Sequence, residues 1–157
     1  MKRIPQDWSI IIGCIVALSA PIAIAASAAE NAIKARHDHY HELGDAFKVI
    51  RDELRASSPN WDRIKPAAQA VKEASVDQGK WFPTGSGPES GLKTRAKAEV
   101  WSDPKGFEAA QLAFAREAPK LVLLSQTGDA EGLTAQFKAV GKTCGGCHDK
   151  FRAPEED

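Results

Sequence analysis

Apolar residues recur at three- and four-residue intervals along much of the chain, which is the spacing of one face of an α-helix. The first such stretch runs from about Ala29 to Arg55, and Ser57-Ser58-Pro59 ends it because a residue before proline disfavours the helical conformation. A second helix follows, for which Asn60 is the expected N-cap and Gln78-Gly79 the expected end. The apolar face of the first helix consists of Ile33, Tyr40, Leu43, Phe47, Ile50 and Leu54.

The stretch from Lys80 to Val100 is predicted to be a long loop. Prolines and glycines are frequent in it, and both residue types interrupt helices and strands. We expect its aromatic residues and the one that follows it to hold the loop against the helices. These are Trp81, Phe82 and Trp101.

Two more helices are predicted after this loop. Asp103-Pro104 supplies an N-cap and a proline at the first helical position, and Gly128 closes the helix that starts there. Pro119 is expected to interrupt and kink this third helix. Asp129 caps the fourth helix. The third helix is expected to be lined by Phe107, Leu112, Phe114, Leu121 and Leu124. The pattern predicts an all-α protein, an antiparallel four-helix bundle.

The first 28 residues read as a signal peptide. Lys2 and Arg3 precede a nearly continuous apolar run, and Ala26-Ser27-Ala28 resembles a cleavage site, so we place cleavage after Ala28. One alternative is an uncleaved anchor, since Ile10 to Ala29 is about long enough to span a bilayer. Another is lipidation at Cys14.

Residues 29–157 therefore form one predicted domain of a 157-residue chain. The whole sequence contains 21 basic and 21 acidic residues. Loss of the leader removes Lys2, Arg3 and Asp7, which leaves 19 basic and 20 acidic residues. Such a balance has no basic surplus, and it argues against nucleic acid as a partner.

The segment Cys144-Gly-Gly-Cys-His148 has the spacing of a c-type haem attachment site. Two thiols on one helical turn, Cys144 and Cys147, can each add to a vinyl group of a haem. The imidazole of His148 then becomes an axial ligand of the iron. The sequence predicts one covalently attached haem c.

Two other chemistries fit the same thiols. A zinc ion would need Cys144, Cys147 and one or two histidines from His37, His39 and His41. A disulfide across the motif is the other. The cysteine count favours haem, because only the two motif cysteines remain after the leader is removed. No acid–base pair or nucleophile constellation appears, so we expect a protein that is not an enzyme.

Several segments resemble the cytochrome c prime family, the class II c-type cytochromes. The C-terminal position of the motif, within residues 140–152, is typical of that family. Further similar segments occur in the family's order. They are Ile33-Lys34-Ala35-Arg36 with Gly44, Phe82-Pro83-Thr84-Gly85-Ser86-Gly87, and Lys97-Ala98-Glu99-Val100-Trp101-Ser102-Asp103-Pro104.

The leader and the haem motif indicate a periplasmic protein, because covalent haem attachment belongs to the periplasmic side of a bacterial membrane. The resemblance implies a homodimer built on the first two helices, with a haem between the last helix and the first. It also implies that Arg36 lies near a haem propionate, where a guanidinium pairs with carboxylate. The alternative for Arg36 is a solvated helix charge. Some members use a methionine of the first helix as sixth ligand, but the single methionine here is Met1, in the leader.

The family spacing and the helical wheel both place Tyr40 at the position of that ligand. We predict five-coordinate, high-spin iron beneath Tyr40. A tyrosinate ligand and a histidine ligand from His37 are the alternatives. The function expected is one-electron transfer between redox partner proteins, with nitric oxide or another diatomic gas bound at the open position. A dedicated nitric oxide-binding protein and a zinc-stabilised structural domain are the other possibilities.

Overall fold

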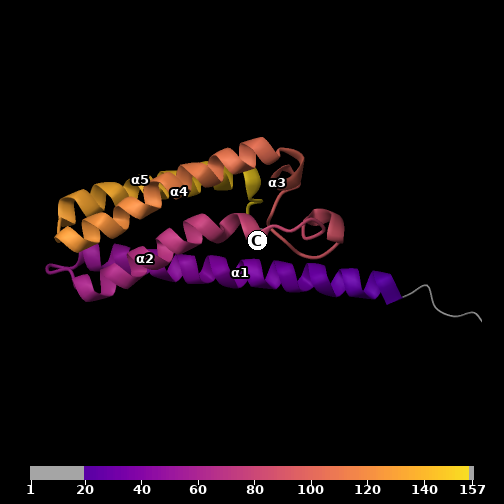
Figure 1. Cartoon of the computed structure of the whole chain (residues 1–157), viewed down its shortest axis with the longest axis horizontal. Coiled ribbons are helices and arrows are strands. Elements are labelled where there is room, and N and C mark those ends of the chain that lie inside the picture. The colour runs from indigo at the N-terminus through magenta and orange to yellow at the C-terminus, as the bar shows by residue number, and fades with distance from the viewer. Residues whose placement is uncertain (1–19, 156–157) are drawn as a thin grey trace, which may run out of the picture.

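The computed structural model describes residues 20–155, with side chains described from Ala26 onward. Four long helices dominate this part of the chain and pack as an all-α bundle, which confirms the predicted fold class (Figure 1). α2 packs against both α1 and α4, and α4 packs against α5. The four helices are α1 (Ala20–Arg55), α2 (Trp61–Asp77), α4 (Pro104–Thr127) and α5 (Ala130–Phe151).

The predicted helix starts are confirmed by side-chain caps. The Asn60 carboxamide oxygen accepts a hydrogen bond from the Asp62 N–H at 3.1 Å. Asp103 accepts from Gly106 N–H at 3.0 Å, and the corresponding carboxylate before α5 accepts from Gly132 N–H at 2.8 Å. Gly128 ends α4 at φ 73°, a left-handed conformation that favours glycine. Local chemistry therefore determines where these helices begin and end.

α1 begins earlier than the pattern predicted, at Ala20 rather than Ala29. Its first turns extend beyond the other helices (Figure 1), and Ala26, Ser27 and Ala28 are exposed. The expected cleavage position thus lies in the exposed part of α1. Most of the predicted leader, including Cys14, lies outside the described residues, so the signal peptide stays a prediction. Across residues 20–155, no helix has the length and apolarity needed to cross a membrane.

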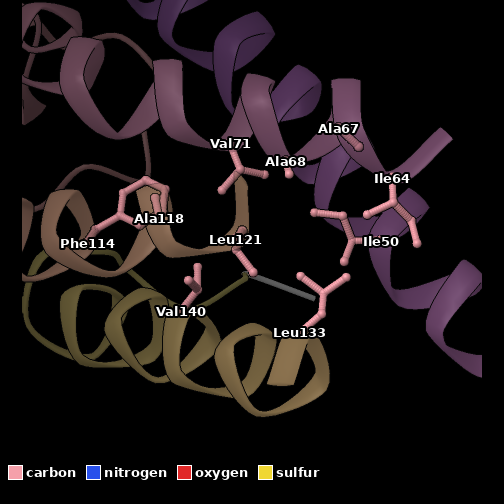
Figure 2. Close-up of a cluster of buried hydrophobic side chains, with 10 residues drawn as sticks. All are labelled: Ile50, Ile64, Ala67, Ala68, Val71, Phe114, Ala118, Leu121, Leu133 and Val140. Carbon is pink, nitrogen blue, oxygen red and sulfur yellow. The ribbon is translucent and has the colours of Figure 1, made fainter. Parts of the chain in front are cut away.

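The main hydrophobic cluster receives side chains from all four long helices (Figure 2). Its fully buried members include Ile50 of α1, Ile64 of α2, Leu121 of α4 and Leu133 of α5. A fully buried side chain of this size contributes roughly 1.5–3 kcal/mol relative to an exposed one. This cluster holds the bundle together over most of its length.

Leu112 was expected to line α4, and this is wrong because the side chain is 50% exposed. The buried positions of α4 include Phe107 and Phe114, and Leu112 lies five residues from the first, about 140° around the helix. Gln111 occupies the inward position between the two phenylalanines. The predicted interruption at Pro119 is also wrong, since α4 runs through it without a break. Proline removes one helical hydrogen bond, and the buried residues on either side continue the packing.

The segment predicted as a loop is mostly irregular, but it contains short helical turns. These are η1 (Gln78–Trp81), η2 (Pro88–Ser90) and α3 (Glu99–Ser102). η2 forms because proline stands at its first position and Gly91 ends it at φ 71°. The expected hydrophobic anchoring is confirmed for Phe82 and Trp101, which pack against a second core cluster formed by Val100, Phe107 and Phe151.

Candidate cofactor site

The motif residues occupy the last turns of α5, where the two core clusters meet. Cys144 packs against the main cluster, while Cys147 packs against the second one. Both are free thiols, so the predicted alternative of a disulfide between them is not present. Burial raises the pKa of both thiols, and their side chains are therefore neutral. The thiols lie one helical turn apart and are available for covalent attachment.

His148 directly follows Cys147, and the residue as a whole is exposed. Partial burial of the imidazole, and then the cations Arg152 and Arg95, lower the pKa of His148. All three causes disfavour the charged ring, so the imidazole is neutral at neutral pH. A neutral imidazole has a free nitrogen lone pair, which is the form that binds a metal. The donor chemistry therefore fits an axial ligand of haem iron.

A pair of backbone contacts beyond the motif fixes the end of α5. The Lys97 N–H donates to the carbonyl of Phe151 at 3.0 Å, and the Ala153 N–H donates to the carbonyl of Arg95 at 2.8 Å. The Lys150 ammonium also pairs with the Asp103 carboxylate. These contacts join residues far apart in the sequence, and sequence reasoning did not find them. They hold the helical turn that carries His148.

Tyr40 of α1 lies at the motif end of the bundle, because its ring meets that of Phe82 at 6.2 Å between centroids, and Phe82 and Cys147 pack against the same cluster. Burial raises the pKa of Tyr40 strongly, and the thiols of Cys147 and Cys144 act in the same direction, while Arg36 opposes them. The phenol ring meets Trp81 edge-on, with 5.0 Å between ring centroids. Tyr40 is thus a neutral phenol, and its ring packs against those of Trp81 and Phe82.

Arg36, one turn before Tyr40, is 5% exposed. Its Nη1 donates to the carbonyl of Trp81 at 3.2 Å and to Ser86 Oγ at 2.9 Å. Its Nη2 donates to the carbonyl of Ser86 at 2.8 Å and to Thr94 Oγ1 at 2.9 Å. The guanidinium also lies 4.9 Å from the centre of the Phe82 ring.

The alternative of a solvated charge at Arg36 is therefore wrong, because the guanidinium is enclosed by the loop. The physical reason is tertiary, since the loop carbonyls and hydroxyls replace the water that would otherwise solvate the cation. The contact with a haem propionate stays a prediction. Arg36 holds the loop from Trp81 to Thr94 against α1.

The three histidines of α1 do not join the motif. The His37 and His41 rings lie 4.6 Å apart, and His39 stacks on Trp81 at 4.8 Å. The His37 side chain is 69% exposed and its Nδ1 is 3.7 Å from Asp38. Within residues 26–155, no three His, Cys, Asp or Glu side chains are close enough to hold a metal ion. Neither the zinc alternative nor a histidine ligand from α1 is supported.

Two buried carboxamides near this end of the bundle were missed by sequence reasoning. Gln78 of η1 is 6% exposed, and Gln111 lies on the inward face of α4. The Nε2 atom of each is buried without a hydrogen-bond acceptor among the described residues. Their burial could have been predicted from the helical pattern of the sequence, because each glutamine occupies an inward position in it. Buried donors that lack acceptors fit a cofactor that brings acceptor atoms.

The family model of Cytochrome C′ matches residues 31–152. A cytochrome c′ of Rhodocyclus tenuis is 34% identical over 127 residues, which are 78% of this chain and 94% of the relative. The cytochrome c′ of Alcaligenes xylosoxydans xylosoxydans is 31% identical over 124 residues, again 78% of this chain and 94% of the relative.

Solved structures agree with these matches. The cytochrome c′ of Thermochromatium tepidum has a TM-score of 0.74 at 26% identity, covering 80% of this chain and 97% of that structure. A nitric oxide complex of a cytochrome c prime variant from Alcaligenes xylosoxidans has a TM-score of 0.71 at 28% identity, with coverages of 80% and 97%. The resemblance found in the sequence is confirmed. The chain belongs to the cytochrome c′ family, and it carries one covalently attached c-type haem.

Proposed function

We propose that this protein is a periplasmic haem protein that transfers single electrons and binds a diatomic gas, chiefly nitric oxide, on the Tyr40 side of the haem. The observation that carries the proposal is the composition of that side. It presents a neutral phenol from α1. The only methionine of the sequence is Met1, so a methionine of the bundle cannot occupy the sixth position.

Three residues of α5 hold the cofactor in this proposal. Cys144 and Cys147 form the thioether bonds, and His148 is the axial ligand, which the free thiols and the neutral imidazole support. The haem iron supplies one-electron chemistry and an open coordination position. The backbone contacts that hold the end of α5 keep His148 oriented.

Tyr40 acts as a lid on the open position. A neutral phenol is a poor ligand, and the raised pKa of Tyr40 disfavours the tyrosinate alternative. The hydroxyl remains able to donate a hydrogen bond to a bound diatomic molecule. Arg36 positions this lid indirectly, because it fixes Trp81, whose ring contacts Tyr40 edge-on.

Relatives support gas binding and assembly. The Alcaligenes xylosoxidans structure is a nitric oxide complex, and another related cytochrome c′ undergoes ligand-controlled dimer dissociation. For this chain we propose a homodimer through α1 and α2, with redox proteins as the electron-transfer partners. Residues 1–28 act as the cleaved export signal. The role is binding and electron transfer rather than enzymatic turnover.

The test is the spin state of the iron in ferric and ferrous protein, before and after nitric oxide is added. We expect high-spin iron in both states, and Tyr40→Phe should keep that spin state while changing the affinity or the release rate of nitric oxide. His37→Ala is the control and should change neither. A low-spin ferric spectrum that becomes high-spin in Tyr40→Phe would establish tyrosinate ligation and contradict the open position.

A dedicated nitric oxide-binding protein is the second candidate, favoured by the same Tyr40 lid. Electron exchange with small redox proteins separates the two functions. Rapid reduction and reoxidation of the haem by such proteins supports the carrier. Slow exchange together with tight nitric oxide binding supports the dedicated binder.

A further inference from the structure

We infer that Gln78 and Gln111 form a buried pair of amide donors that binds a propionate carboxylate of the haem. The inference rests on the proposed attachment of that haem at Cys144 and Cys147. It assigns a binding role to two residues outside the motif. It also explains why polar side chains occur on the inward faces of α4 and η1.

The first observation is the lack of an acceptor. The Nε2 atoms of Gln78 and Gln111 are buried without a partner among the described residues. Leaving a buried donor unpaired destabilises the fold, because the group loses its hydrogen bond to water without gaining another. Other buried polar side chains are paired: Ser125 Oγ donates to the carbonyl of Val122 at 2.7 Å, and Arg36 donates to four oxygens. Across residues 26–155, these two amides are the buried side-chain groups that have no partner.

The second observation is that the Gln111 carboxamide packs against η1, next to Gln78. A Cβ added to Gly79 would lie 3.5 Å from Gln111 Oε1 and 3.6 Å from its Nε2. Gly79 directly follows Gln78 in η1, so the Gln111 carboxamide packs beside the backbone that carries the other amide. η1 and α4 are therefore in contact at the point where both glutamines are attached.

The third observation is the position of Gln111 along the length of the bundle. Gln111 lies between Phe114, which belongs to the main cluster with Cys144, and Phe107, which belongs to the second cluster with Cys147. Figure 2 shows Phe114 at one end of the main cluster. Gln111 therefore lies at the boundary between the clusters, and the attachment motif crosses the same boundary on α5.

The chemistry of haem completes the argument. Haem carries two propionate carboxylates, and a carboxylate is buried only where donors replace its water. Amide N–H groups supply hydrogen bonds without adding a charge. The four terminal N–H contacts of Arg36 go to the loop, so its guanidinium is largely used already. Unpaired amide donors and a propionate carboxylate are therefore complementary.

The test uses the haem-containing protein with Gln78→Leu, Gln111→Leu and the double variant. Each change removes a donor without adding a side chain that binds iron. We expect a lower reduction potential, because the full negative charge of the carboxylate then stabilises ferric iron. We also expect a shifted propionate bending frequency in the resonance Raman spectrum and a lower melting temperature.

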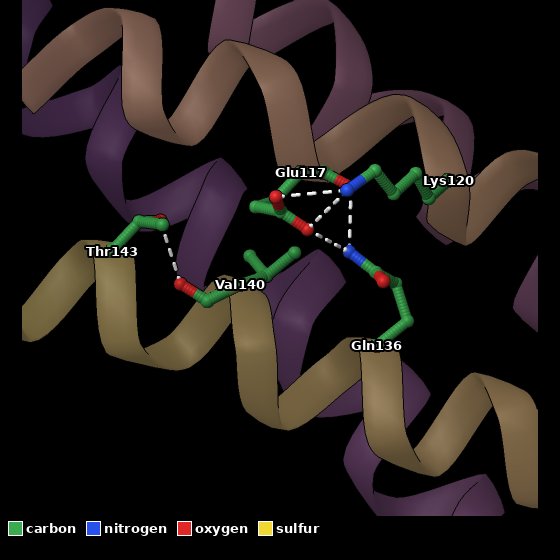
Figure 3. A network of polar contacts seen from close by, with 5 residues as sticks. All are labelled: Glu117, Lys120, Gln136, Val140 and Thr143. Atoms are coloured by element: carbon green, nitrogen blue, oxygen red, sulfur yellow. Dashed lines mark hydrogen bonds and ion pairs between the residues drawn. The ribbon is translucent and has the colours of Figure 1, made fainter.

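Gln136→Leu is the matched control. Gln136 is a partly buried glutamine of α5 whose Nε2 donates to the Glu117 carbonyl at 3.0 Å and to Glu117 Oε2 at 2.8 Å (Figure 3). Its loss should lower the melting temperature without changing the reduction potential or the propionate frequency. Gln111→Asn, which keeps the amide but shortens it, gives a second measurement if Gln111→Leu folds poorly.

Three outcomes would overturn the inference. A higher melting temperature with an unchanged potential means that the amides are unpaired in the haem protein as well. A lower melting temperature with an unchanged potential and unchanged propionate frequency means that they bind water or a protein carbonyl. A higher reduction potential in both single leucine variants means that the amides do not donate to a propionate. Failure of haem attachment is distinct, since wild-type protein would then show no Soret band, and failure of the proposed gas binding would show as a low-spin wild-type spectrum.

Discussion

The two ends of the bundle are built differently. Where α1 meets α2 and α4 meets α5, the interior is aliphatic, and Ile50, Ile64, Leu121 and Leu133 are all 0% exposed. At the motif end the second cluster is small and aromatic, with the Phe107 and Phe151 rings 5.1 Å apart. The first end completes its core with its own side chains. The second end depends on more than apolar packing.

Polar groups show the same contrast. Away from the motif, Glu117 pairs with Lys120 at 2.8 Å and accepts from Gln136, which ties α4 to α5 (Figure 3). At the motif end, a buried guanidinium holds a loop, and the Nε2 atoms of Gln78 and Gln111 have no acceptor in the described part of the chain. The motif end therefore has unpaired hydrogen-bond donors, as expected of a site that receives a cofactor.

The largest effect should follow from removing both thiols. Cys144→Ala combined with Cys147→Ala should abolish covalent haem, because the only other cysteine of the sequence is Cys14, which is 130 residues before the motif. His148→Ala is the comparison and should keep the haem attached while changing its ligation. Acid–acetone extraction followed by an absorbance spectrum measures both. Extraction of haem from wild-type protein would disprove thioether attachment.

Leu121→Ala should lower the free energy of unfolding by about 2–5 kcal/mol, since it leaves a cavity in the fully buried aliphatic core. Leu123→Ala on the same helix is the control, because that side chain is 64% exposed and its loss should change stability by about 0.5 kcal/mol or less. Urea unfolding of the haem protein gives both values. Equal effects would mean that the aliphatic end does not hold the bundle together.

Arg36→Leu should loosen the motif end without disturbing the aliphatic one. Loss of the guanidinium leaves the carbonyls of Trp81 and Ser86 without a donor, a cost of about 1–3 kcal/mol. Amide hydrogen exchange should become faster within residues 80–95 and stay unchanged around Ile50. Lys34→Ala is the control, since that side chain is 73% exposed. Unchanged exchange in the loop would show that Arg36 does not hold it.

The smallest effect concerns the ion pair at the end of α5. The hydrogen bond from Lys150, and then that from the Gly106 N–H, hold the pKa of Asp103 below its usual value. Folding therefore favours the charged carboxylate. Its contribution to stability is complete above the unfolded pKa of about 3.9 and is lost as the pH falls through the lower folded value.

Asp103→Asn keeps an N-cap but removes this titration. Wild type should be slightly more stable than the variant at neutral pH, and the difference should disappear in acid. Thermal unfolding between neutral pH and pH 2 measures it. High salt provides the control, since it screens an exposed pair. A difference that grows as the pH falls would contradict the lowered pKa of Asp103.

The sequence by itself determined the parts of this protein that depend on neighbouring residues. Asn60, Asp103 and Asp129 mark helix starts because a side-chain cap reaches only two or three residues along the chain. In the same way, the three-residue spacing of Cys144 and Cys147 places two thiols on one helical turn, which predicts covalent attachment of a haem. The resemblance to the cytochrome c′ family followed from such local segments taken in order.

Only the tertiary structure decided which side chains meet across the bundle. Nothing near Arg36 in the sequence indicates that Ser86 and Thr94 are its partners, because 50 and 58 residues separate them. The hydrophobic pattern placed Leu112 inward, yet the helix turns Gln111 to the interior instead. Hydrophobicity is a property of one residue, whereas burial depends on the rotation of a helix against its neighbours, and packing sets that rotation.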